Sequence, residues 1–285
     1  MKKIIVCLVL FFGITAIAVS QDLTSKNGVP ILPQEGEWCI GADAVPFFIY
    51  MGNFFNGNQG NGAPDFDFTG PYPMTLYVKH MASATWAMRG KLRISYNAFT
   101  DKEFITKDAE TPDPDVTVED KAKRSNMDIV LGAGAEMRRG KGRLQGVYGA
   151  EALIMFGAGK DKFEYGNTWD PDVPHFVTNF GDNYFIEYEG FITENKQGTT
   201  FGFGLRGFVG VEYFFAPKIS LGGEFGWGPM ITSEGKGSMT YEFEDINQST
   251  GQSFINSRTI ESGGESNIGL NMDNLSGAIN LLFYF

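Results

Sequence analysis

Residues 201–215 read FGFGLRGFVGVEYFF, and this stretch decides the fold. Its odd-numbered residues are mostly large and apolar, whereas the residues between them are mostly small or charged, as at Arg206 and Glu212. Successive side chains of a strand point to opposite faces, so a period of two predicts a strand with one apolar and one polar face. Residues 275–285, LSGAINLLFYF, alternate in the same way as far as Phe285.

The same pattern recurs along the chain and predicts eight strands, joined by short and long connections that alternate strictly. This segregation is typical of an all-β transmembrane barrel, antiparallel and eight-stranded, with short periplasmic turns and long extracellular loops. A soluble β-sandwich also alternates, but nothing in it requires the long loops to gather at one end. The strands are expected at 37–50, 74–81, 86–98, 126–138, 143–159, 199–215, 218–228 and 274–285. Tight turns are expected at 82–85, 139–142 and 216–217, and long loops at 51–73, 99–125, 160–198 and 229–273.

The bulk composition excludes two classes of protein. With 14% aromatic residues the chain is not disordered, and a net charge of −11 gives no basic footprint for a nucleic acid, so no nucleic-acid partner is expected. The mean hydropathy of −0.15 resembles that of a soluble protein. It does not exclude membrane strands, because lipid-facing and interior residues alternate and cancel in the average.

The first twenty residues form a targeting signal. Lys2 and Lys3 precede an apolar stretch over 4–19, and small residues at Ala18 and Ser20 suit signal-peptide cleavage before Gln21. A transmembrane anchor is the alternative, but the stretch is shorter than the roughly 20 residues that a span needs. We therefore expect a signal peptide at 1–20, a periplasmic segment at 21–36 and an outer-membrane barrel at 37–285, in a Gram-negative bacterium. Cys39 is then the one remaining cysteine.

Aromatic residues gather at the ends of the predicted strands, as expected for rings that favour the two membrane interfaces. Ordinary β propensity explains aromatic residues in strands, but not their position at strand ends. The periplasmic belt would contain Trp38, Trp86, Tyr213, Phe215, Phe283 and Phe285, and the outer belt Tyr50, Tyr96, Phe201, Phe225 and Trp227.

With its signal peptide, eight alternating strands and terminal Phe285, the chain resembles the small bacterial outer-membrane β-barrel family, which includes the OmpA transmembrane domain, OmpX and OmpW. The resemblance implies that the barrel-insertion machinery reads the last strand, and that outer-membrane lipid or lipopolysaccharide surrounds the barrel. The residues that match the insertion signal are Ile279, Leu281, Phe283 and Phe285. Nothing here matches the peptidoglycan-binding domain of full-length OmpA.

Alternation also assigns a set of charged residues to the inside of the barrel. An eight-stranded barrel has an interior just wide enough for side chains. Unpaired charge is costly there, so opposite charges should pair and plug the interior. The alternative is a narrow, porin-like path for ions or small solutes lined by Arg89, Lys91 and Arg93. The full set is Asp43, Lys79, Arg89, Lys91, Arg93, Asp128, Glu136, Glu151, Arg206, Glu212 and Glu224.

The long loops are acidic, and the third is rich in aromatic residues. They either bind a protein partner or pack on one another over the barrel mouth. Neither histidine, His80 on an outward face or His175 in the third loop, belongs to a catalytic motif, so no enzyme and no cofactor are expected. The paired carboxylates at 65–67 and 113–115 lack EF-hand spacing, so no metal is expected either. The sequence thus predicts a non-enzymatic envelope protein with a structural or interaction role.

Overall fold

The computed structural model describes residues 23–56, 74–168, 170, 173–178, 180, 190–271 and 279–285. The predicted signal peptide lies outside them. This part of the chain forms one large antiparallel sheet and a single helix, which confirms the all-β class. Within it no helix is long and apolar enough to cross a membrane. The elements are β1 (Trp38–Asp43), α2 (Val45–Phe55), β2 (Thr75–Ser83), β3 (Trp86–Thr106), β4 (Thr117–Lys141), β5 (Leu144–Glu164), β6 (Gly190–Lys196), β7 (Thr200–Ala216), β8 (Ile219–Glu234), β9 (Gly237–Ile246), β10 (Ser253–Ser262), β11 (Glu265–Asn271) and β12 (Ile279–Tyr284).

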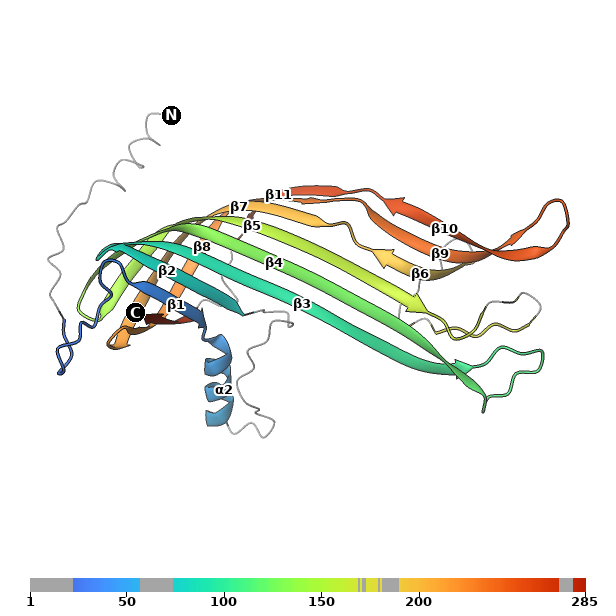
Figure 1. The fold of residues 1–285 in the computed structure, drawn as a ribbon, viewed down its shortest axis with the longest axis horizontal. Coiled ribbons are helices and arrows are strands. Elements are labelled where there is room, and N and C mark those ends of the chain that lie inside the picture. The colour runs from blue at the N-terminus through green and yellow to red at the C-terminus, as the bar shows by residue number, and fades with distance from the viewer. Residues whose placement is uncertain are drawn as a thin grey trace, which may run out of the picture.

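Eight of these strands pair in a circuit that returns to its start (Figure 1). We call this circuit, β1-β2-β3-β4-β5-β7-β8-β12, the ring. The first and last strands close it, with Cys39 opposite Tyr284 and Asp43 opposite Asn280. Three two-residue turns lie at one end, which we call the turn end: 84–85, 142–143 and 217–218. Each overlaps the turn that the sequence predicts, and the second and third end one residue later.

In a soluble sheet protein the face towards the core is apolar and the outer face is polar. In the ring this arrangement is reversed. On β7 the outward side chains of Phe201 and Leu205 are each 54% exposed, whereas the inward Arg206 and Glu212 are 4% and 1% exposed. The outward faces of the other ring strands also carry exposed apolar residues, among them Ile40, Met88, Leu131, Ile154, Phe225 and Phe283. The ring therefore buries charge and exposes hydrocarbon.

The first predicted strand, 37–50, is wrong beyond Asp43, because α2 follows it. Pro46 has no N–H for a strand ladder, and its fixed φ suits the first turn of a helix. The Asp43 carboxylate accepts the Val45 N–H at 2.8 Å, which also favours the turn into the helix. Tyr50, expected in the outer aromatic belt, thus lies on a helix.

The expected long loops contain much of the additional strand structure. β3 and β4 run on to Thr106 and Thr117, so the loop expected at 99–125 shortens to 107–116. β6 pairs with β5 and β9, and β9 pairs with β10. We call these outer parts of β3–β5, with β6, β9 and β10, the extension (Figure 1). Its strands escape a period-two search because charged residues stand on both faces, as at the consecutive residues Lys123 and Arg124 of β4.

The last predicted strand, 274–285, is described in part. β12 begins at Ile279, and residues 272–278, with Leu275 and Gly277 of the predicted pattern, lie outside the described residues. Before this gap, β11 pairs with the upper part of β8.

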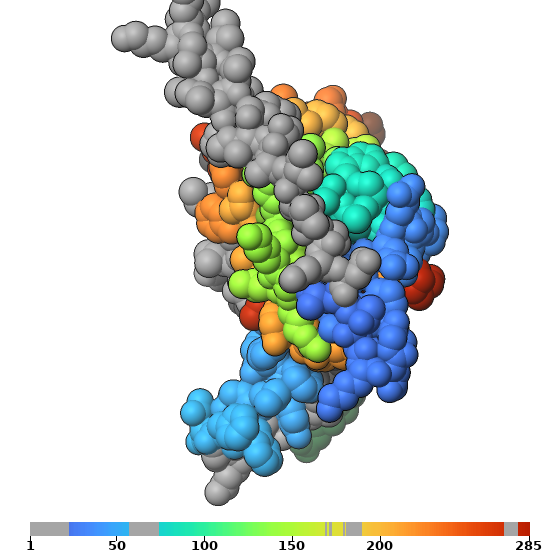
Figure 2. Space-filling model, turned by 90° about the vertical axis from the view of Figure 1, so that its left-hand side faces the viewer, coloured from blue at the N-terminus to red at the C-terminus, as the bar shows by residue number. Residues whose placement is uncertain are grey.

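The segment 23–37 packs against the turn end of the ring (Figure 2). Ile31 is 3% exposed and belongs to a buried cluster with Met81, Phe214 and Leu282. The Lys218 ammonium group holds the segment through the Glu37 carboxylate at 2.6 Å and the Leu32 carbonyl at 3.0 Å. The N-terminal segment is therefore an ordered cover rather than a loose tail.

Candidate functional site

Nine charged residues fill the middle of the ring and form the candidate site, which we call the ionic cluster. They come from β2, β3, β4, β5, β7 and β8, and every side chain is at most 7% exposed. Buried charge is stable only when it is paired, and each member has at least one partner of opposite charge. The cations are Lys79, Arg89, Lys91, Arg138 and Arg206, and the carboxylates are Glu136, Glu151, Glu212 and Glu224.

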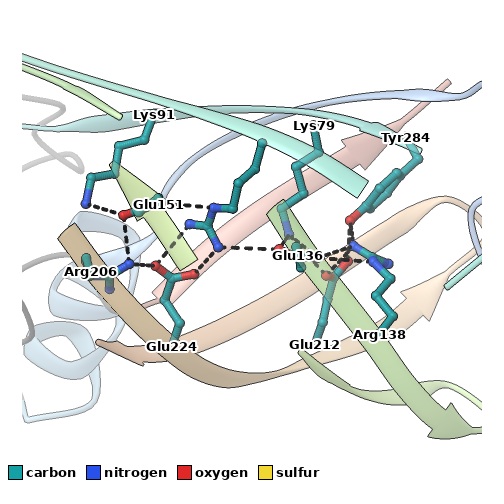
Figure 3. Close-up of polar contacts among 10 residues, drawn as sticks. Lys79, Lys91, Glu136, Arg138, Glu151, Arg206, Glu212, Glu224 and Tyr284 are labelled. Carbon is teal, nitrogen blue, oxygen red and sulfur yellow. Dashed lines mark hydrogen bonds and ion pairs between the residues drawn. The ribbon is translucent and has the colours of Figure 1, made fainter. Parts of the chain in front are cut away.

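The half of the cluster nearer the turn end is built around Glu136 and Glu212 (Figure 3). Lys79 Nζ lies 2.8 Å from Glu136 and 3.5 Å from Glu212, and Arg138 lies 3.1 Å and 2.8 Å from the same two carboxylates. The Tyr284 hydroxyl donates to Glu212 at 2.8 Å and also contacts Arg138. Ser220 donates a further hydrogen bond to Glu212 at 2.6 Å.

The other half is built around Glu151 and Glu224. Arg206 bridges these two carboxylates, at 2.9 Å and 3.0 Å, and Lys91 Nζ lies 3.1 Å from Glu151. Arg89 joins the halves, because its guanidinium lies 2.9 Å from Glu224 and 3.4 Å from Glu136. The ion pairs therefore form one continuous network across the interior.

Small residues make room for the cluster at two close approaches. A Cβ at Gly226 would lie 2.3 Å from Nε of Arg206, and one at Gly149 would lie 2.8 Å from Phe208. The Phe208 ring in turn lies under Arg89, with the guanidinium carbon 4.1 Å from the ring centroid, a cation–π geometry. Glycine is thus required where bulky inward side chains fill the space.

Three residues of the predicted charge set lie apart from the cluster. Arg93 Nε donates to Thr75 at 3.0 Å, and Asp43 accepts the backbone N–H that begins α2. Asp128 is exposed and accepts a hydrogen bond from Asn126 at 3.1 Å. The other eight members of the set are brought together.

Sequence reasoning missed Arg138 and Tyr284. Arg138 is two residues beyond Glu136 on the same face of β4, so the alternation itself points to it, but it stands where the strand was expected to end. Tyr284 shares the inward face of β12 with Asn280 and Leu282. Its partner Arg138 is 146 residues away in the chain, a contact that no local pattern reveals.

Both histidines have structural neighbours. The His80 ring lies on the outer face with its centroid 4.6 Å from that of Trp38. His175 Nδ1 contacts the Asp108 carboxylate, which also accepts the Phe176 N–H at 2.8 Å, and its ring packs against Phe191. Asp172, three residues before His175 in the sequence, lies outside the described residues.

Many aromatic residues of the expected third loop pack inside the extension. Phe163 and Ile192 are buried with Tyr241, which is 1% exposed, and Tyr165 and Phe180 pack against them. These residues therefore pack on one another, as the second alternative predicts, and do not form an exposed binding surface. Trp169, Tyr184, Phe185 and Tyr188 lie outside the described residues.

The described residues contain no candidate metal site, but a pocket of about 550 Å³, which is large enough for a ligand, lies beside the ionic cluster and is lined in part by Glu151, Arg206 and Trp227. Among the described residues no group of three or more His, Cys, Asp or Glu side chains could hold a metal ion. Asp113 accepts the Asp115 N–H at 2.9 Å, whereas Asp65 and Asp67 are not described. A cavity of about 110 Å³ beside Arg93 and Met155 is smaller than the roughly 300 Å³ at which ligand pockets begin.

The residues of the predicted insertion signal alternate along β12. Phe283 and Phe285 are 46% and 66% exposed on the outer face, and Ile279 and Leu281 lie on that face at lower exposure. Phe285 exchanges two backbone hydrogen bonds of 2.9 Å with Trp38, which fixes the chain end to the first strand.

No protein-family model, no curated protein and no solved structure matches this chain.

Proposed function

We propose that this chain is an eight-stranded β-barrel that spans the outer membrane of a Gram-negative bacterium and has a structural or interaction role, not an enzymatic one. A single observation carries the proposal: the ring exposes an alternating apolar and aromatic wall while it buries its charges. In water such a wall would be a large aggregation-prone patch, whereas in a bilayer it is the required surface. The likeness to the small outer-membrane barrel family belongs to the same proposal.

The dimensions of the wall support this reading. A membrane strand needs about 9–11 residues. On β3 the apolar outward stripe runs from Trp86 to Tyr96, and on β7 it runs from Phe215 to Phe201, with aromatic residues at both ends. Where the strands of the closed ring pair, their backbone N–H and C=O groups bond to one another, so no unpaired strand edge faces lipid.

The interior supports a closed barrel over the narrow channel that is the alternative. Arg89 and Lys91, two of the cations expected to line a path, are buried in ion pairs. The N-terminal segment covers the turn end, where its Ile31 is buried against Met81 and Phe214. For an ion or small solute to pass, both the ionic cluster and the N-terminal segment would have to move.

Cell fractionation tests the membrane assignment. We expect the full chain in the outer-membrane fraction, resistant to extraction with alkaline carbonate. Replacing the outward Phe203 and Leu205 with Asp should prevent stable insertion, whereas the same change at the exposed turn residues Ser249 and Thr250 should not. Recovery of the wild-type chain as a soluble protein would refute the proposal.

Planar-bilayer recording separates the closed barrel from the channel. The purified protein should show no steady current above that of the bilayer alone. Reproducible unitary openings would favour the channel.

Identification of the proteins that are extracted together with the barrel tests the interaction role. The extension ends in β10, whose Phe254 and Ile260 are 47% and 38% exposed. If a partner binds there, extraction in mild detergent followed by mass spectrometry should identify a protein that is lost from a Phe254→Asp/Ile260→Asp variant. If nothing is lost, the interaction role is refuted and the structural role stands.

A further inference from the structure

The helix α2 carries no charged side chain and is exposed over much of its surface. None of its eleven residues is buried, and Phe47, Ile49, Phe54 and Phe55 are 47%, 57%, 66% and 76% exposed. The sequence contains no charged residue from Ala44 to Pro64. A surface helix of a water-soluble protein normally carries one polar face, whereas the polar side chains of α2 are only Tyr50 and Asn53.

The helix leaves the ring at the level of the apolar wall. It begins directly after β1, where Ala42 stands opposite Leu76, and Leu76 stands opposite Leu92 of β3. The outward stripe of β3 continues past this level to Ile94 and Tyr96, which are 38% and 53% exposed. The helix thus starts within the height of the wall and not beyond it.

The direction of α2 carries it away from the ring. Figure 1 shows it pointing sideways from the end of β1, across the direction of the strands, and Figure 2 shows it beyond the outline of the ring. Eleven residues at about 1.5 Å each reach roughly 16 Å from the wall. A helix in this position would lie in the plane of a bilayer that surrounds the ring.

We propose that α2 binds the acyl chains of membrane lipid and anchors the first loop laterally in the bilayer. This inference rests on the membrane-spanning ring proposed above. Acyl chains are the occupant that the surface fits, because the helix begins within the height of the apolar wall, exposes apolar side chains and carries no cation for a lipid phosphate. Burying its exposed aromatic side chains in hydrocarbon stabilises the embedded state in proportion to the apolar area removed from water.

Nitroxide labels on single cysteines, read by their collision rates with oxygen and with a water-soluble nickel chelate, test this proposal. Labels at Ile49→Cys and Phe54→Cys are about 140° apart around the helix, so they sample two faces. Phe203→Cys on the ring is the lipid reference, and Ser249→Cys in the exposed β9–β10 turn is the water reference. Cys7 is lost with the predicted signal peptide and the native Cys39 is 0% exposed, so the unmodified mature protein should take up no label. The full chain is extracted folded and reconstituted in vesicles of phosphatidylcholine alone.

The expected result is an oxygen-to-nickel collision ratio at both helix positions that matches Phe203 and exceeds Ser249 several-fold. A high nickel collision rate at either position places that face in water and overturns the proposal. Low collision rates with both reagents mean that protein covers the helix, which also overturns it. If the label at Phe203 itself is accessible to nickel, it is the membrane-spanning ring that fails.

Discussion

At the scale of single residues, the interior is organised by carboxylates that each serve several cations. Glu136 contacts Lys79, Arg89 and Arg138 while no part of its side chain reaches solvent. Removing one member of such a group leaves its partners buried and uncompensated, which costs more than the intact pair contributes. Neighbouring residues on the outward face provide matched comparisons.

Arg138→Ala tests the cluster. We expect it to lower the free energy of unfolding by about 3–5 kcal/mol, because Glu136 and Glu212 lose a buried partner. Urea unfolding of the protein in phosphatidylcholine vesicles measures this. Arg139→Ala, at the exposed next position, is the control and should change little. Equal losses in the two variants would show that the ion pairs add no stability.

Gly226→Val tests the space beside Arg206. The added side chain would meet the guanidinium, whose partners Glu151 and Glu224 hold it in place, and overpacking of this kind costs about 1–3 kcal/mol. Gly269→Val, where nothing lies within 4 Å of the added Cβ, should be tolerated. The same unfolding measurement compares them, and a neutral Gly226→Val would mean that Arg206 is free to move.

At the scale of elements, the extension has its own small core. Tyr241 of β9 is almost completely buried against Phe163 and Ile192, far from the cluster inside the ring. Elements with separate cores open as separate cooperative units. The extension should therefore lose its order without the ring losing its own.

Tyr241→Ala tests this independence. Removing a buried aromatic ring costs about 3–5 kcal/mol, which should fall on the extension alone. Hydrogen exchange should quicken in β6 and β9 and stay unchanged in β7. Phe254→Ala, at a position 47% exposed, is the control. Faster exchange throughout the ring would contradict the prediction.

Acid should loosen the extension through its exposed ion pairs. Hydrogen bonds from Lys123 and Lys162 lower the pKa of Glu164 from 4.5 to about 2, and Lys160 and Lys196 lower that of Glu194. A carboxylate whose folded pKa is depressed stabilises the fold above pH 4.5 and loses this contribution as the pH falls towards 2.

The expected readout is a modest fall in hydrogen-exchange protection of residues 160–164 across that pH window, after correction for intrinsic rates. The effect is small because these pairs are exposed. A Lys123→Met/Lys162→Met variant should flatten the pH response of this segment. If the pH response of this segment is unchanged in the variant, titratable groups other than these ion pairs cause it.

At the scale of the whole molecule, two barriers lie along the axis of the ring: the N-terminal segment at the turn end and the ionic cluster within. They are built from different parts of the chain, and Lys218 with Glu37 fixes only the first. The cluster alone spans the interior from β2 to β8.

Deleting residues 23–34 separates the contributions of the two barriers. We expect the shortened protein to conduct no more than the full chain in planar bilayers, because the cluster remains in place. A steady current in the deletion variant would show instead that the N-terminal segment is the seal.

The local sequence pattern predicts on which face of a strand a residue lies. Alternation places Lys79, Arg89 and Glu212 on the inward face, where the structure has them. It fails where another local rule takes precedence, as at Pro46, which turns the first strand into a helix. It fails again in the extension, where charges on both faces hide strands from a hydrophobic search.

The sequence by itself determined the all-β class, the tight turns and the inward facing of the charges, because these follow from the two-residue period of a strand and from turn chemistry. Only the tertiary structure decided which charges meet, since Arg138 and Tyr284 are 146 residues apart and come together only when β1 pairs with β12 and the sheet closes. It also decided that α2 leaves the wall with none of its residues buried, because the packing of a helix depends on what the rest of the fold places beside it.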